Sequence, residues 1–158
     1  MMSGRKSVSA SLEAKFLEVL RGLVPDIPAV GFLEDALAGE QKQEDPTSIR
    51  VKVDNFSQPN EATCAFSLSV EIGLRVEQAE SACGGLFLDA HERIALWLEQ
   101  VMLGDACVEL GTAEAHVDGF RRTGDVKNFD TTNGDWLAVW TVTLWGRIKP
   151  SEEQETNQ

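Results

Sequence analysis

The chain has few cysteines and histidines, the side chains that most often bind zinc or carry redox chemistry. Among 158 residues there are three cysteines and two histidines. Cys64, Cys83 and Cys107 form no C-x-x-C pair and are odd in number, so neither a disulfide framework nor a zinc knuckle is indicated. We expect free thiols buried in a reducing compartment, with thiol redox chemistry as the alternative.

Basic residues are also few. The 14 Lys and Arg stand against 26 Asp and Glu, a formal charge of -12. Because phosphate binding needs a concentrated positive face, this balance argues against a general affinity for nucleic acid. Arg121, Arg122 and Lys127 form the one compact basic cluster. It faces solvent, a carboxylate-rich neighbour, or DNA passing nearby, and the sequence leaves these alternatives open.

Long hydrophobic runs are missing as well. The longest falls far short of the roughly 20 residues that a membrane span requires, and the start "MMSGRKSVSASLEAKF" has no apolar core of the signal-peptide kind. The length and the 42% hydrophobic content suit one domain with its own core. We therefore expect a single α+β domain over residues 1–150, made in a cytoplasm, with no membrane contact. The acidic end 151–158, "SEEQETNQ", is expected to be a disordered tail.

Hydrophobic periodicity predicts the elements of this domain. In chain order they are a helix over 12–24, a short helical turn at 32–37, strands over 49–53 and 62–76, a helix over 86–101, a strand from 108 toward 120, and a strand over 136–148. The order α-β-β-α-β-β predicts helices packed on a largely antiparallel four-stranded sheet.

The second predicted strand alternates strictly, with apolar residues on one face and Ser, Thr, Glu and Arg on the other. The polar face is only weakly charged in its middle. It is either the wet side of a sheet or a surface for another subunit, and both interpretations stay open.

The last predicted strand is rich in tryptophan. Trp136 and Trp140 share a face with Val142 and Leu144, which predicts core packing against the helices. Trp145 falls on the opposite face. Because aromatic anchors are enriched at protein contacts, Trp145 is a candidate interface residue.

The stretch 117–148 starts and ends like a strand but has a polar, glycine-punctuated middle. This pattern predicts a long loop between two strands, centred on 123–133. Arg121, Arg122, Lys127, Asp125 and Asp130 lie in or beside it and are the further interface candidates. The two aspartates are also a conceivable acid/base or cation-binding pair, but carboxylates are common in so acidic a chain.

Candidate catalytic patterns are incomplete. His91 and Glu92 begin like the zinc motif H-E-x-x-H, but Ala95 stands where the second ligand belongs. Gly84-Gly85 precede a helix without completing a phosphate-binding G-x-x-x-x-G-K-[ST] or G-x-G-x-x-G pattern, so an entry turn is the simpler interpretation.

The other histidine, His116, lies between Glu114 and Asp118, which the strand period places on its own face. Such a histidine is either a base or metal ligand in a small ligand-binding domain, or part of a solvated polar strand face. We expect no catalytic residue, no metal and no cofactor.

The order of these segments resembles that of the tail terminator, or tail completion, proteins of long-tailed bacteriophages. The likeness covers residues 48–148. It rests on "SLSVEIGLRVE", then "LDAHERIALWLEQVM", then "VDGFRRTGDVKNFD" leading into "WLAVWTVTLWGRI", whose last part has a W-x-x-x-W-x-V-T-L pattern. Related neck and connector proteins share much of it.

This resemblance implies a structural virion protein without enzymatic activity. It implies a homo-oligomeric ring, commonly a hexamer, that caps the head-proximal end of the tail tube and offers a surface for joining the head. The partners would be further copies, the tube protein and head-tail connectors, with DNA passing the acidic lumen unbound. Other tail or neck subunits, such as a tube protein or a connector, are the alternatives.

Overall fold

The computed structural model describes residues 7–32, 47–60, 64–77, 83–103, 105–129 and 135–150. Its elements are α1 (Val8–Leu23), β1 (Ala29–Gly31), β2 (Ser48–Asn60), β3 (Ala65–Val76), α3 (Cys83–Leu103), the 3-10 helix η2 (Asp105–Leu110), β4 (Ala115–Phe129) and β5 (Trp136–Ile148).

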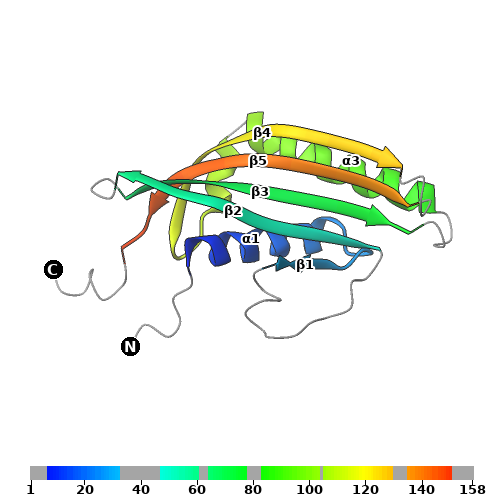
Figure 1. The fold of residues 1–158 in the computed structure, drawn as a ribbon, viewed down its shortest axis with the longest axis horizontal. Coiled ribbons are helices and arrows are strands. Elements are labelled where there is room, and N and C mark those ends of the chain that lie inside the picture. Colours follow the sequence, from blue (N-terminus) through cyan, green and yellow to red (C-terminus); the bar gives the residue numbers. More distant parts are fainter. Residues whose placement is uncertain are drawn as a thin grey trace.

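The strands form one mixed sheet in the order β1-β2-β3-β5-β4 (Figure 1). Strand β1 runs parallel to β2, and the other neighbours are antiparallel. The predicted four-stranded sheet is therefore wrong by one strand. The predicted order α-β-β-α-β-β is also wrong, because β1 adds a strand between α1 and β2 and η2 follows α3. Strand β1 has only three residues, which is too short for alternation to reveal, and it exists because Ala29–Gly31 pairs with β2 from Ile49 to Val51.

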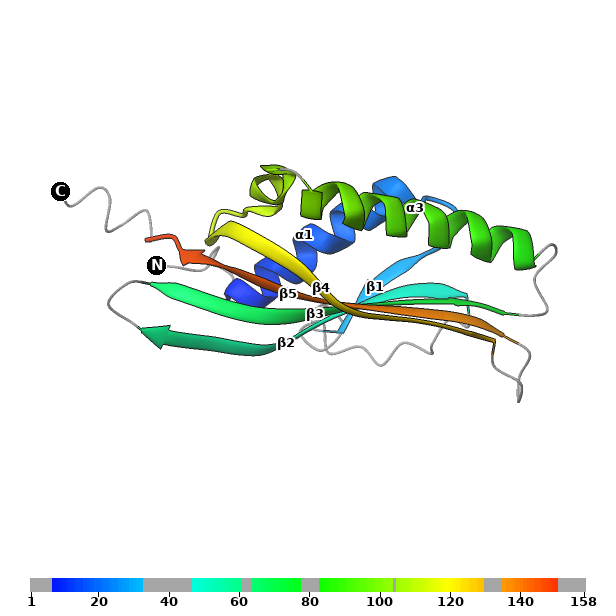
Figure 2. The ribbon, with the colours of Figure 1, turned by 90° about the horizontal axis from the view of Figure 1, so that it is seen from above.

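Both long helices lie on the same side of the sheet, and no described helix covers the other side, which we call the open face (Figure 2). The chain therefore has the predicted α+β class. Figure 2 also shows that β2 and β3 continue past the helical layer at their hairpin end.

Helix α1 begins and ends where its sequence directs. The Ser7 hydroxyl caps it by accepting a hydrogen bond from the amide of Ala10 at 3.1 Å. The amide of the C-cap residue Val24 donates to Leu20, and Pro25 follows. The predicted helix 12–24 is thus confirmed, with an additional first turn.

Helix α3 confirms the predicted helix 86–101 and extends it at both ends. Its inner side is fully apolar, with buried Phe87, Ala90, Ile94, Leu98 and Val101. It meets α1 where Trp97 and Phe16 pack edge to face, with ring centroids 5.8 Å apart.

The core lies between the helices and the inner face of the sheet. Every second residue of β3 from Phe66 to Val76 is buried, and β5 repeats this alternation. Trp140 is 1% exposed at the centre of β5, as predicted, and its ring centroid lies 5.0 Å from that of His91 on α3. Trp136 is partly buried and packs against Phe87.

The predicted strand from 108 is wrong at its start. Residues 105–110 form η2, and β4 begins only at Ala115. The turn between them is held by Thr112, whose hydroxyl oxygen accepts from the amides of Glu114 and Ala115, both at 3.2 Å. Such a side-chain bond to the backbone favours a turn over an extended strand.

The predicted loop at 123–133 is largely a strand. Strand β4 continues to Phe129, which pairs with Trp136 at the start of β5. Register shifts between Val117 and Gly119, and between Arg122 and Gly124, accommodate the glycines as irregularities of the ladder. Backbone pairing with β5 therefore overrides the weak strand propensity of this segment. Residues 130–133 lie outside the described part.

Two smaller expectations also change. Cys64 is exposed in the turn before β3, with φ 57°, so the predicted burial of this thiol is wrong. Cys107 is buried, as predicted. The predicted helical turn at 32–37 lies outside the described residues except for Phe32, as does the predicted tail at 151–158.

Candidate functional site

The open face of the sheet is the first candidate surface. Its central residues on β3 and β5 are partly exposed, and most are small and polar: Ser67, Ser69, Gly73, Thr141 and Thr143. No described helix covers them (Figure 2). This is the face that the sequence predicted to be weakly charged in its middle.

Trp145 lies on this open face, opposite in direction to the buried Trp140. Its side chain is 42% exposed. Its cross-strand neighbour is Gly119, where a Cβ atom would overlap the indole ring. The absence of a side chain at Gly119 therefore lets the indole lie flat across β4, where it still presents a large apolar area to the outside.

An ion pair lies beside Trp145. The Arg147 guanidinium donates to both carboxylate oxygens of Asp118, at 3.0 and 3.2 Å. The pKa of Arg147 is raised, first by this hydrogen bond and then by the charge of Asp118. Both side chains are well exposed, so the pair orders the surface more than it stabilises the fold.

Arg121 and Arg122 are exposed on β4, the edge strand. Arg121 pairs in register with Thr143, which makes it a diagonal neighbour of Trp145 on the open face. Neither arginine forms an ion pair within the described part of the chain. Arg122 pairs in register with the buried Val142, so it is directed to the other face of the sheet. We call Arg121, Trp145, Arg147 and Asp118 together the basic patch.

The remaining predicted interface residues are only partly placed. Asp125 and Lys127 belong to β4, in backbone register with Trp140 and Ala138. Their side chains and all of Asp130 lie outside the described part. The structure thus brings Arg121 and Trp145 together on the open face, whereas Arg122 is directed to the other face of the sheet.

A second candidate surface runs along the outer side of α3. Three of the large hydrophobic residues exposed in the described structure lie there, Leu88 at 51%, Leu96 at 50% and Met102 at 38%. Two exposed carboxylates, Glu92 and Glu99, lie between them. We call these five residues the acidic ridge.

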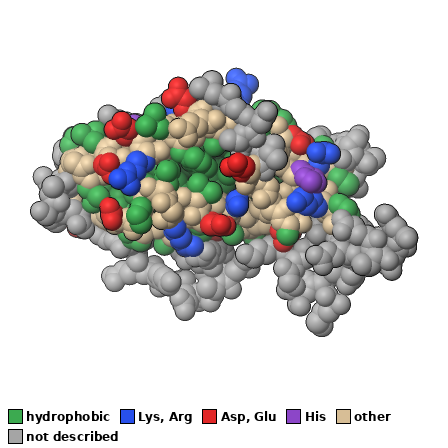
Figure 3. All heavy atoms as spheres, turned by 180° about the vertical axis from the view of Figure 1, so that it is seen from behind, with side chains coloured by type: hydrophobic (Ala, Val, Ile, Leu, Met, Phe, Trp, Pro, Cys, Tyr) green, Lys and Arg blue, Asp and Glu red, His purple; other side chains and the backbone are tan. Residues whose placement is uncertain are grey.

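The acidic ridge was not predicted. At 100° per residue its members fall within about 120° of the helix circumference, so it is a continuous stripe. The helix side of the molecule shows hydrophobic side chains among charges of both signs (Figure 3). The usable signal was that "LFLDAHERIALWLEQVM" carries leucines beyond those needed for one buried face.

The histidine sites do not assemble a metal centre. Glu114 precedes β4 and is buried, whereas His116 is exposed and Asp118 is bound by Arg147. His91 packs between the rings of Phe87 and Trp140. In the described residues no three His, Cys, Asp or Glu side chains are grouped to hold a metal ion.

One shallow groove, of about 280 Å³, lies between α1 and the turn before β4. Its polar lining includes Ser11 and Thr112, whose hydroxyls are hydrogen-bonded to each other at 3.0 Å. These groups connect α1 to the β4 turn, which is a structural role.

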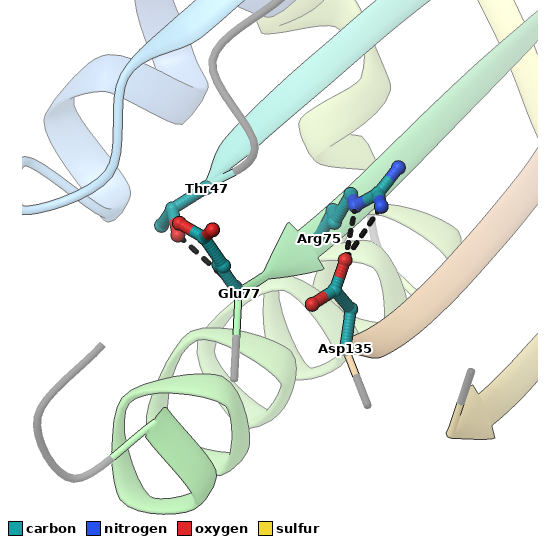
Figure 4. Close-up of polar contacts among 4 residues, drawn as sticks. All are labelled: Thr47, Arg75, Glu77 and Asp135. Atoms are coloured by element: carbon teal, nitrogen blue, oxygen red, sulfur yellow. Dashed lines mark hydrogen bonds and ion pairs between the residues drawn. The ribbon is translucent and has the colours of Figure 1, made fainter. Parts of the chain in front are cut away.

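Two side-chain contacts lie at the end of the sheet where β3 ends and β2 and β5 begin (Figure 4). The Arg75 guanidinium at the end of β3 binds Asp135 just before β5, with Nε to Oδ2 at 2.9 Å. The Thr47 hydroxyl accepts from the amide of Glu77 at 3.1 Å. Together they hold the start of β2, the end of β3 and the start of β5 in register.

No known protein-family model matches this chain, and a search of curated proteins finds no match either. The described helices include none that is both long enough and apolar enough to cross a membrane.

Proposed function

We propose that this protein is a structural subunit that assembles with further copies into a closed ring, and that the ring is the tail terminator of a long-tailed bacteriophage. The ring, a hexamer by analogy, caps the tail tube and presents the surface to which the head joins. Its site of action is the virion, after assembly in the host cytoplasm, and it has no enzymatic role.

The observation that carries this proposal is the open, weakly charged sheet face with Trp145 exposed beside the edge strand. Protein contacts are enriched in tryptophan and arginine, and here a partly exposed tryptophan lies beside arginine. The sheet also has long unpaired edges: no described strand lies outside β4, and β1 covers only three residues of β2. An exposed edge and face of this kind favour association with other chains.

The net charge of -12 supports the proposal that the ring is a tail terminator, through which DNA has to pass. A ring wall that is negative overall repels the phosphate backbone, so DNA passes without being held. The partners in this scheme are other copies, the tube protein and the head-tail connectors.

The test is the mass of the purified protein by size-exclusion chromatography with light scattering, followed by negative-stain imaging. A closed ring is expected, either free or on purified tails. Open filaments would instead indicate a tube subunit. A protein that remains monomeric and does not bind tails would contradict the proposal.

A further inference from the structure

The two charged surfaces of this chain are complementary to each other. The basic patch has two arginines against one aspartate, in a chain that is strongly acidic overall. The acidic ridge has two carboxylates, Glu92 and Glu99, that form no ion pair within the described structure. Each surface also carries exposed apolar area, from Trp145 on one and from Leu88, Leu96 and Met102 on the other.

The spacing of the groups also agrees. Glu92 and Glu99 are seven residues apart, which is about 10 Å along a helix, and Leu96 lies between them. On the sheet, Arg147 and the row of Arg121 are four residues apart along β5, which is about 14 Å, with Trp145 midway. Arginine side chains are long enough to cover the difference. On the sheet, Trp145 thus lies between two cations, and on α3, Leu96 lies between two carboxylates. The two rows match in charge and in the position of the apolar residue.

One copy cannot make this contact with itself. The ridge is on the outer side of α3, while Trp145 lies on the open face across the sheet (Figure 2). We infer that the basic patch of one copy docks on the acidic ridge of a second copy, so that copies join head to tail. This inference rests on the proposed ring and names the two surfaces that close it.

A head-to-tail contact has two consequences. Each copy keeps one free surface of each kind, so assembly continues until the chain of copies closes. The contact combines a central apolar anchor with charges at its rim, so added salt weakens it by slowing association.

The test uses two charge-reversed proteins. The ridge variant is Glu92→Arg with Glu99→Arg, and the patch variant is Arg121→Glu with Arg147→Glu. Each is expected to raise the concentration for half-assembly at least tenfold in light scattering, because like charges then face each other. The two variants shift the net charge of -12 in opposite directions, so a general charge effect would not weaken both.

Mixing the two variants gives the decisive measurement. The reversed ridge of one then matches the reversed patch of the other, and alternating copies assemble again at wild-type concentrations. Glu18→Lys with Asp26→Lys is the matched control, since both residues are exposed and lie outside the two surfaces; it should assemble as the wild type does. Circular dichroism verifies folding, and neutral Gln substitutions at the same four positions replace any variant that fails to fold, with a smaller loss expected.

The outcomes separate this inference from the ring itself. If the wild type forms rings and either reversal leaves them unchanged, or if the mixture does not recover, the contact assigned here is overturned while the ring stands. If the wild type assembles neither alone nor on purified tails, both are overturned.

Discussion

The indole ring of Trp145 occupies the space that a side chain on Gly119, its cross-strand neighbour, would fill. The glycine is therefore required by the tryptophan. Packing over Gly119 holds the indole of Trp145 against the sheet, although the side chain is 42% exposed on the open face.

Replacing Trp145 with Ser tests the role of this residue in assembly. Because the side chain packs only on the outer face, we expect a loss of about 1–2 kcal/mol in the free energy of unfolding. Self-association should fall much more strongly. Urea denaturation measures the first effect and light scattering the second.

Trp140→Ala is the control for that experiment. Its ring is 1% exposed in the core, so we expect a loss of about 3–5 kcal/mol. A comparable loss for Trp145→Ser would mean that Trp145 belongs to the core of the subunit.

The Gly119 relationship predicts non-additive effects. In the wild type, Gly119→Ala should cost about 1–3 kcal/mol of stability, because the new methyl group displaces the indole. In the Trp145→Ser background the same change should cost clearly less. A double-mutant cycle from urea unfolding measures this coupling, and strictly additive losses would show that the two residues do not constrain each other.

The Arg75–Asp135 pair should contribute to stability despite partial exposure of the arginine. Asp135 is 3% exposed, and Arg75→Met removes the guanidinium bound to its carboxylate. We expect a loss of about 1–3 kcal/mol in the free energy of unfolding. Arg147→Met removes the equivalent partner from the exposed pair with Asp118 and should cost clearly less stability. Equal losses for the two variants would contradict this account.

Deleting residues 123–133 should disrupt the fold. The deletion removes the second half of β4, which pairs with β5 from Trp136 to Thr141. We expect an insoluble protein or one without a cooperative thermal transition. Removing only 131–133 keeps both described strands and should leave a cooperative transition. A stable, folded 123–133 deletion would show that this half of β4 is dispensable.

The predictability of the fold varied with the range of the interactions involved. Helices α1 and α3 and the alternating strand β3 could be predicted because caps and hydrophobic periodicity are local signals. Strand β1 and the second half of β4 could not, because a three-residue strand and a polar, glycine-containing strand depend on their partners. The sequence predicted Gly124 to lie in a loop, whereas in the structure it lies at a register shift in the pairing of β4 with β5.

The candidate surfaces were predicted in part. The period of two placed Trp145 opposite Trp140, and the local density of basic residues singled out Arg121 and Arg122. The β4–β5 register, which is a long-range property, places Arg121 on the same face as Trp145 and Arg147 and directs Arg122 to the other face. The acidic ridge was not predicted, because apolar residues occur around most of α3. The periodicity therefore did not distinguish the exposed apolar residues of this helix from the buried ones.

By itself, the sequence determined the α+β class, the buried faces of its long elements, an acidic net charge and the outward direction of Trp145. Tertiary structure alone decided that β4 is a full edge strand, that Gly119 receives the indole, and that basic and acidic surfaces lie on opposite sides of the sheet. The physical reason is that side-chain period is encoded locally, whereas backbone pairing satisfies each strand only through residues distant in the chain.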